Sequence, residues 1–566
     1  MPLPARTVTR RAFLTAPAVL ALAQSVLPKP AQALVSPSIP TSPERSLAEA
    51  AVISTKSAAR DGFFRVPWLP RLFESDLLVD DSLLFRDTAL RAASVVANGA
   101  FHERNFSKLQ FIAAPKNKHG AHRIFAIMEP VDAVSFLILA LLAAPAIEAR
   151  KVPAAARIVH SYRFRPEAGG LFDRDFTFAT FLAAASSRAE KEGFIVSCDF
   201  ANCYGNLHHT HIAAALERSG VVAWQVNYVA ELLAFWQTEK SRGLPVGSYA
   251  SNILAEAALL QIDKSLGDAD VDFVRYVDDF RIFAPDEAGA RQAVAALAEA
   301  AAPWGLSLNP DKTKIVRFVN AEEGSLGKTS TSGIAQYRTR TAQDASLSRK
   351  KTYGQILPIN FRRAGIGEIG RLRRGKWRPN AAAFLDSSPV PYIRLRRAIR
   401  RAIYTGHWEF VHALPAILNR YPEFGSYVAS ALRQTSSFIP AGVRDGLKGK
   451  FAAVLLSPTT PDFVAIKLVD ILSHPAYRAR RVLEHFAQAR AVDPRGLCFR
   501  WALDALRNTG GLMPEFSEHF VRMDGWGKRA VVADPSARAL LNLPPGNNDP
   551  FIAKLTSVTR GPRSVT

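Results

Sequence analysis

The chain has 566 residues, enough for about two to four domains, and its 48% apolar content excludes a globally disordered chain. Its formal net charge of +22 indicates a polyanionic partner such as nucleic acid, and contact with an anionic membrane or solubility conferred by charge are the alternatives. The three cysteines include no CxxC pair, which excludes a disulfide framework and a zinc ribbon.

Residues 1–60 are rich in Ala, Pro and Ser, and we expect a poorly ordered N-terminal extension there. Arg10 and Arg11 precede an apolar run, and Ala31-Gln32-Ala33 follows it, a pattern typical of twin-arginine export signals. Further along, the apolar segment 133–147 is too short to span a bilayer and contains Pro145. It predicts a buried helix.

Carboxylates mark the ends of predicted strands in the next part of the chain. Residues 194–199 read as a buried strand that ends at Asp199. Residues 243–251 form a loop punctuated by Gly and Pro, and an apolar helix is expected over 252–266. Residues 273–283 place Asp278 and Asp279 between two strand-like runs, which predicts a hairpin with both aspartates at its tip.

Paired aspartates on a tight turn between strands are suited to a divalent cation, because Mg²⁺ prefers a few hard oxygen ligands. Transfer of a nucleotidyl group uses two such ions, one for the attacking oxygen and one for the leaving oxygen. A solvated surface turn is the alternative reading of Asp278-Asp279 when it is taken alone.

The three segments together resemble motifs A, B and C of reverse transcriptases. Residues 115–125 are similar to the fingers segment of these enzymes and residues 305–314 to their motif D, so the resemblance covers roughly residues 85–320. Ser161-Tyr162-Arg163, Ala255-Glu256 and the Arg275 that precedes the aspartates resemble the bacterial abortive-infection and defence-associated branch, the unknown-group reverse transcriptases.

The resemblance implies an α+β fold, with the fingers and palm of a right-hand polymerase followed by an all-α helical-repeat region. We place the fingers at 61–165, the palm at 166–320, a basic linker at 321–400 and the helical region at 401–566. Independent amphipathic stripes support helices over 444–456, 462–473, 479–490 and 498–507. A further stripe over 408–418 is interrupted by Pro415.

By resemblance, Asp199 and Asp278 bind two Mg²⁺ ions, with Mn²⁺ as an alternative metal. Asp279 is a weaker third ligand and the carbonyl of Phe200 an additional oxygen. Lys312 would protonate the leaving pyrophosphate. A surface placement of Lys312 is the plain alternative.

Tyr204 corresponds to the sugar gate of the family, a ring that excludes a ribose 2′-hydroxyl. Lys116, Lys118 and Arg123 would bind the triphosphate, and Gly247 lies in the nucleotide-binding loop. Val246 departs from the family, which often has Gln there, so the resemblance leaves ordinary templated synthesis in question. In some related enzymes a tyrosine primes synthesis. The candidates here are Tyr404, Tyr421, Tyr427 and Tyr477.

The implied activity is RNA-directed DNA polymerisation, in antiphage defence, with deoxynucleoside triphosphates, an RNA template and a DNA product. The helical region could guide product, bind a structured non-coding RNA or drive homo-oligomerisation. The alternatives are a retron-type or mobile-element reverse transcriptase and a catalytically silent nucleic-acid-binding scaffold. Because deoxynucleotides are cytoplasmic, we expect a cytoplasmic protein without a membrane partner, and a fortuitous export-like N-terminus or a misplaced start.

Overall fold

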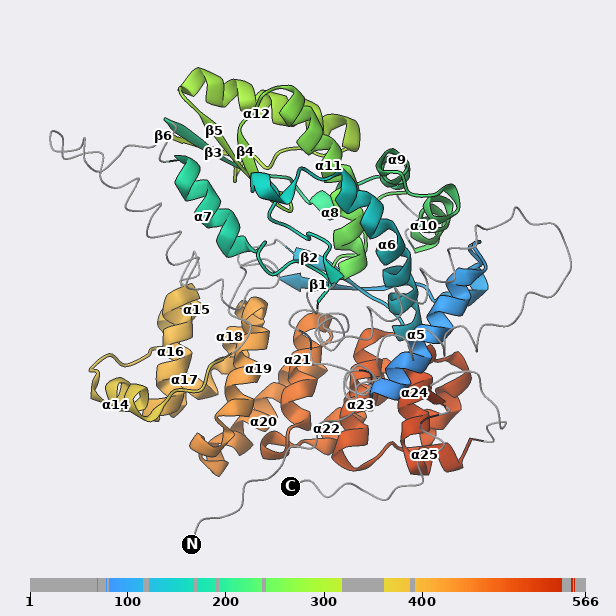
Figure 1. Cartoon of the computed structure of the whole chain (residues 1–566). Coiled ribbons are helices and arrows are strands. Elements are labelled where there is room, and N and C mark those ends of the chain that lie inside the picture. Colours follow the sequence, from blue (N-terminus) through green and yellow to red (C-terminus); the bar gives the residue numbers. More distant parts are fainter. Residues whose placement is uncertain are drawn as a thin grey trace, which may run out of the picture.

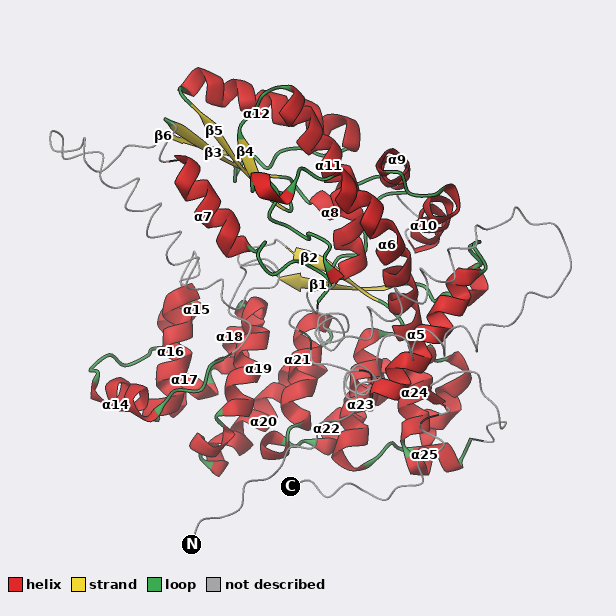
Figure 2. Ribbon diagram, in the orientation of Figure 1, coloured by secondary structure: helices red, strands yellow, loops and turns green. Residues whose placement is uncertain are grey.

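A computed structural model describes residues 69, 78, 81–115, 122–166, 170–189, 193–236, 241–317, 361–386, 392–541, 551, 552 and 554. Helices dominate the fold, and the strands form two small sheets (Figure 2). The predicted α+β fold with a helical C-terminal region is thereby confirmed. The predicted N-terminal extension, residues 1–60, lies outside the described residues.

The larger sheet has the strand order β4-β5-β3-β6, and each neighbouring pair is antiparallel. Side chains alternate between its faces, as the strand period of two requires. Val196, Phe280 and Ile282 are buried in the main core on one face, and Ile195 and Phe283 pack in a smaller core on the other. The strands are β3 Phe194–Asp199, β4 Phe273–Tyr276, β5 Asp279–Ala284 and β6 Lys314–Arg317.

Helices cover both faces of this sheet, which we call the palm sheet because it lies within the predicted palm, residues 166–320. The smaller core includes side chains of α7, whereas α11 and α12 contribute to the main core (Figure 1). The helices of this half are α5 Ser82–Ala97, α6 Pro130–Arg150, α7 Phe178–Ala189, α8 Cys203–Asn206, α9 His209–Ser219, α10 Ala223–Trp236, α11 Tyr249–Asp268 and α12 Glu287–Ala301.

Helix α6 contains the apolar segment that the sequence predicts to be buried. Among the described residues it is the one helix long and apolar enough to cross a membrane, and 72% of its most apolar window is buried. Phe136, Leu137 and Ile138 are completely inaccessible to solvent. The helix therefore forms part of the core, as expected.

A two-stranded hairpin, β1 Gln110–Pro115 and β2 His122–Ile127, corresponds to the predicted fingers segment. It lies between the palm and the C-terminal helices (Figure 1). Its buried side chains Ile112, Phe125 and Ile127 belong to the same hydrophobic core as the C-terminal helices. The hairpin also reaches the palm, because the amide of Ala126 donates to the carbonyl of Val246 at 3.1 Å. It thus connects the two halves of the molecule.

The C-terminal half is a row of short packed helices (Figure 1). The predicted stripes correspond to helices α17 and α18, which are separated at Ala413, and to α20–α23. The helices are α14 Ile366–Arg374, α15 Ala382–Leu385, α16 Tyr392–Thr405, α17 Trp408–His412, α18 Leu414–Arg420, α19 Gly425–Gln434, α20 Ala441–Leu456, α21 Asp462–Ser473, α22 Arg480–Arg490, α23 Leu497–Gly510, α24 Gly525–Ala533 and α25 Pro535–Ala539.

The segment expected to be a basic linker, 321–400, has two parts. Residues 318–360 lie outside the described residues. From Phe361 onward the chain packs into the core of the helical region, where Phe361, Phe384 and Leu395 are buried. The basic residues of 361–386 are therefore carried by a folded segment, partly on α14 and partly on the non-helical stretches beside it.

A group of buried charges, here called the joint cluster, ties the C-terminal helices to the start of α6. It consists of Glu129, Arg500, Asp524, Trp526 and Arg529. Arg529 forms an ion pair with Glu129, and Arg500 forms one with Asp524. The amide of Trp526 donates to Glu129 at 3.1 Å, and its ring lies 4.9 Å from the Arg500 guanidinium. This cluster fixes one end of the helical row to the other half of the chain.

Candidate active site

The structure brings the two predicted carboxylate sites together on neighbouring strands. Asp199 ends β3, Asp279 begins β5, and these two residues are directly opposite each other in the antiparallel register. Asp278 lies in the turn between β4 and β5, as the sequence predicts. The geometry therefore places three aspartates together where β3 ends and β5 begins.

The turn that carries Asp278 has an unusual backbone at Val277. This residue has a φ of +57°, in the left-handed region that β-branched side chains rarely adopt. A conformation of this kind persists only when its surroundings hold it in place. The carbonyl of Val277 accepts a hydrogen bond from Nη1 of Arg275 at 3.0 Å. Arg275 thus holds the residue that immediately precedes Asp278.

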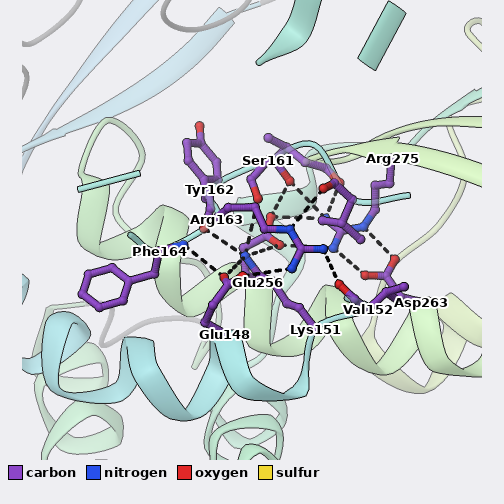
Figure 3. A network of polar contacts seen from close by, with 12 residues as sticks. Glu148, Lys151, Val152, Ser161, Tyr162, Arg163, Phe164, Glu256, Asp263 and Arg275 are labelled. Atoms are coloured by element: carbon purple, nitrogen blue, oxygen red, sulfur yellow. Dashed lines mark hydrogen bonds and ion pairs between the residues drawn. The ribbon is translucent and has the colours of Figure 1, made fainter. Parts of the chain in front are cut away.

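Arg275 is itself fixed by buried carboxylates, although it lies on a strand (Figure 3). Its Nε donates to Asp263 at 2.7 Å, and its Nη2 donates to Glu256 at 3.1 Å. Burial alone would raise the pKa of Glu256, but the neighbouring cations Arg275 and Lys151 lower that pKa to about 2. The glutamate is therefore ionised, and every nitrogen of the guanidinium group has a hydrogen-bond acceptor.

The same network extends to the end of α6 and to the segment that follows it (Figure 3). Ser161 donates to Glu256 at 2.8 Å, and Arg163 donates to Glu148 at 2.9 Å. Lys151 lies 3.3 Å from both Glu148 and Glu256. We call this set the palm network: Glu148, Lys151, Ser161, Arg163, Glu256, Asp263 and Arg275. It unites the three segments on which the finer sequence resemblance depends.

Asp278 experiences strong repulsion from its surroundings. Burial, together with the charges of Asp199 and Asp279, raises the pKa of Asp278 to about 8. Asp279 is more open, with a side chain 39% exposed and 3.9 Å from Arg281. Asp199 and Asp278 are thus the inner pair, Asp279 lies at the rim, and its weaker role as a ligand remains a prediction.

Lys312 forms an ion pair with the carboxylate of Asp199, and its side chain remains 56% exposed. The segment that carries Lys312 is tied to the end of β3, because the amide of Asn309 donates to the carbonyl of Asp199 at 2.7 Å. Phe200 is buried and bridges to Leu308 in the same segment. The structure therefore places Lys312 at the carboxylates.

The carboxylates fit a divalent cation by their chemistry. Burial and the charges of Asp199 and Asp279 raise the pKa of Asp278, and a cation bound between these carboxylates would relieve their repulsion. Within the described residues, no three His, Cys, Asp or Glu side chains are already gathered as a metal cage. Asp199 and Asp278 would hold the metal, with Asp279 and the Phe200 carbonyl as the predicted further ligands.

Tyr204 lies beside the glycine loop. Its hydroxyl donates to the amide oxygen of buried Asn252 at 3.0 Å, and its carbonyl accepts from Leu244 at 2.8 Å. Gly247 has a φ of +110°, and a Cβ there would lie 3.3 Å from the ring of Phe125. Glycine is required at this position by the backbone conformation and by the close approach of the fingers hairpin.

Of the three cations predicted to bind the triphosphate, the structure describes one, Arg123. Lys116 and Lys118 lie outside the described residues. Arg123 is half-buried on β2, where it pairs with Ala114 in the hairpin register. Its position on the hairpin is as expected, and its role remains a prediction.

The four tyrosines considered as primers are all buried. The hydroxyl of Tyr404 accepts from the amide of Ala364 at 2.8 Å, and that of Tyr477 donates to Leu432 at 3.3 Å. Tyr421 donates to the carbonyl of Phe384 at 2.5 Å. Tyr427 donates to the carbonyl of Arg396 at 3.5 Å. In this conformation they act as core residues.

Sequence reasoning missed Glu148, Lys151 and Asp263 as members of the site. Each is a charged residue at a helix end or inside an apolar helix, and all three reach buried partners. Asp263 is buried in α11 together with thirteen other residues of this helix, most of them apolar. A buried position in an apolar helix is the signal that could have indicated its ion pair.

Comparison with protein families matches residues 153–351 to the reverse transcriptase (RNA-dependent DNA polymerase) family. This range includes Asp199, Tyr204, the glycine loop, Asp278 and Lys312. The chain therefore carries a reverse transcriptase domain, the domain of RNA-directed DNA polymerases, which are nucleotidyltransferases.

No curated protein matches the sequence. Among solved structures, the chain is similar to a telomerase from Candida albicans, solved in complex with the TWJ fragment of telomeric RNA, at 13% identity and a TM-score of 0.28. The alignment covers 64% of this chain and 66% of that chain, just under two thirds of its length. So low a TM-score supports no conclusion about the present protein.

Proposed function

We propose that the protein synthesises DNA on an RNA template from deoxynucleoside triphosphates. The observation that supports this most directly is that Asp199, at the end of β3, and the Asp278-Asp279 turn between β4 and β5 come together inside the matched reverse transcriptase domain. A silent scaffold would have no need to keep carboxylates that repel each other. Their retention favours an active enzyme.

The residues of the site have three proposed roles, namely metal binding, positioning of Asp278 and proton donation. When bound, two Mg²⁺ ions, or Mn²⁺ in their place, supply activation of the 3′-hydroxyl and neutralisation of the leaving pyrophosphate. Asp199 and Asp278 hold them, and the Arg275–Val277 contact keeps Asp278 in position. Lys312, paired with Asp199 and partly exposed, is placed to donate a proton at its Nζ beside the same carboxylate.

The test is extension of a DNA primer on an RNA template of defined sequence. We expect Mg²⁺-dependent products whose sequence is complementary to the template, and none from Asp199→Asn. Products that form without regard to the template would restrict the proposal to untemplated synthesis. Equal extension by wild type and Asp199→Asn would contradict it.

Tyr204 is proposed to select the sugar. Its ring would collide with a 2′-hydroxyl, so Tyr204→Val should admit ribonucleotides while deoxynucleotide incorporation survives. Tyr204→Phe is the matched control, because it keeps the ring and loses only the hydroxyl bond to Asn252. If the valine variant keeps the wild-type preference for deoxynucleotides, Tyr204 is only a packing residue.

For the biological role we propose antiphage defence in the bacterial cytoplasm. Support comes from the sequence resemblance of Ser161-Tyr162-Arg163, Glu256 and Arg275 to defence-associated enzymes. The test is plating of a phage panel on cells that express the full chain or Asp278→Ala. Protection by the wild type alone is the expected result. An absence of protection against the whole panel would favour the retron-type or mobile-element alternative.

A further inference from the structure

The start of the helical region carries an unusual concentration of positive charge. Residues 361–401 contain twelve Arg or Lys residues and only two acidic residues, Glu368 and Asp386. Glu368 is already neutralised by Arg400, at 2.8 Å. Most of these cations are exposed on α14, on the segment that follows it, or on α16.

Four exposed cations at the end of α14 and just after it have no side-chain partner within the described part of the chain. These are Arg371, Arg374, Lys376 and Arg378, for which no side-chain hydrogen bond or ion pair is present. Cations at the end of a helix can act simply by satisfying its last carbonyls. For Leu372 in the last turn of α14 that explanation fails, because a different residue already donates to its carbonyl.

That residue is Arg401, which is buried at 7% exposure. Its guanidinium donates to the carbonyls of Leu372, Gly375 and Trp377. A Cβ at position 375 would lie 2.6 Å from Nη1 of Arg401, so a side chain there would displace the guanidinium. The segment after α14 is therefore held firmly, and its own cations are left directed at solvent.

Trp377 lies between Lys376 and Arg378 in this fixed segment. Its side chain is 38% exposed, which is unusual for a large ring on a protein surface. Cations beside an exposed ring match the chemistry of a single-stranded nucleic acid, in which phosphates alternate with bases that can stack. We propose that Arg371, Arg374, Lys376, Arg378 and Trp377 form a binding surface for single-stranded nucleic acid. The proposal rests on the proposed polymerase function and names where its strand is held.

An anionic membrane is the competing partner, since Ile366 and Ile393 are also exposed nearby, at 92% and 66%. The ring between the cations and the polymerase domain on the same chain favour nucleic acid. Vesicles that contain phosphatidylserine provide the arm of the experiment that separates the two.

The experiment measures binding of a short labelled single-stranded RNA, and of the DNA of the same sequence, to the full chain across a salt series. Substitution of all four cations by Gln should weaken binding on the order of a hundredfold at low salt. It should also lower the salt slope by about 3, at roughly 0.7 per lost phosphate contact. Preference for RNA or DNA identifies template or product as the bound strand.

Trp377→Ala should weaken binding about tenfold through lost stacking and leave the salt slope unchanged. Trp377→Phe should restore most of that loss. The matched charge control replaces four exposed cations on other elements by Gln, and its slope should equal that of the wild type. The control residues are Arg104, Lys264, Arg478 and Arg481.

Failure of this surface and failure of the polymerase assignment give different results. Asp278→Asn should bind the oligonucleotides as the wild type does, since binding needs no chemistry. Equal slopes for the quadruple variant and its control would overturn the proposal. The proposal would also be overturned if the full chain bound the phosphatidylserine vesicles and neither oligonucleotide, and if the quadruple variant lost that vesicle binding.

Discussion

Two groups of buried charges, the palm network and the joint cluster, hold different parts of this molecule together, and they are satisfied to different degrees. Every guanidinium nitrogen of Arg275 in the palm has an acceptor. In the joint cluster, Nε and Nη1 of buried Arg500 have no hydrogen-bond partner within the described residues. Arg500 relies on one ion pair with Asp524 and on contact with the ring of Trp526.

The carboxylates differ only in part, because burial raises the pKa of Asp263 in the palm network as it does that of Glu129 in the joint cluster, and the contrast lies in Glu256. Glu256 of the palm network has a pKa lowered to about 2, because Arg275 and Lys151 outweigh its burial. Glu129 of the joint cluster has a pKa raised by burial, despite its arginine neighbours. A saturated network fixes one geometry, whereas an incompletely paired one tolerates change. The catalytic turn is thus held rigidly, and the attachment of the helical region is more permissive.

The largest effect is expected from Arg275→Met. It leaves Glu256 and Asp263 buried without their main partner and should cost about 3–5 kcal/mol of unfolding free energy. Urea denaturation followed by circular dichroism measures it. Arg275→Lys is the control, since it restores a charge but cannot bond both carboxylates and Val277 together. If Arg275→Met lowered the free energy of unfolding by less than Arg500→Met does, the distinction between the palm network and the joint cluster would be wrong.

Arg500→Met should have an intermediate effect, about 1–2 kcal/mol, measured in the same way. Two of its nitrogens already lack partners, so little is lost with them. In this variant the Asp524 carboxylate would still accept hydrogen bonds from the amide of Gly527, at 2.9 Å, and from Nε2 of Gln110, at 3.2 Å. A cost as large as that of Arg275→Met would show that the joint cluster is equally rigid.

Glu129→Gln should have the smallest effect and should change the pH dependence of stability. A raised pKa in the folded state means that Glu129 favours folding while protonated, and that this contribution is lost as the pH rises above about 4.3. The variant should match the wild type at low pH and become relatively more stable toward neutral pH. Thermal midpoints over a pH series provide the measurement, and parallel curves would contradict the raised pKa.

The sequence was sufficient to predict the strands next to Asp199 and Asp278, because each is a short apolar run that ends at an aspartate, a pattern typical of a buried strand. Helices α20–α23 followed from their apolar periodicity in the same way. Local pattern determines such elements, so their prediction needs no knowledge of distant contacts.

Other features depend on contacts between residues far apart in the chain. A strand position such as that of Arg275 gives no sign that its guanidinium turns back to the carbonyl of Val277. Nor does the fingers hairpin reveal that Phe125 will share a core with α21, more than three hundred residues later. The folded character of residues 361–386 was missed because their charge concealed the few apolar positions that are buried.

The central claim is that Asp278, held by Arg275, is required for DNA synthesis. The most direct measurement is the rate of Mg²⁺-dependent deoxynucleotide incorporation on a primed RNA template by Asp278→Asn. The matched control is Asp268→Asn, the same chemical change at the exposed end of α11. We predict a loss of about a thousandfold or more for Asp278→Asn, equivalent to roughly 4 kcal/mol of transition-state stabilisation, and no loss for the control. Incorporation by Asp278→Asn at the rate of the control would contradict the account.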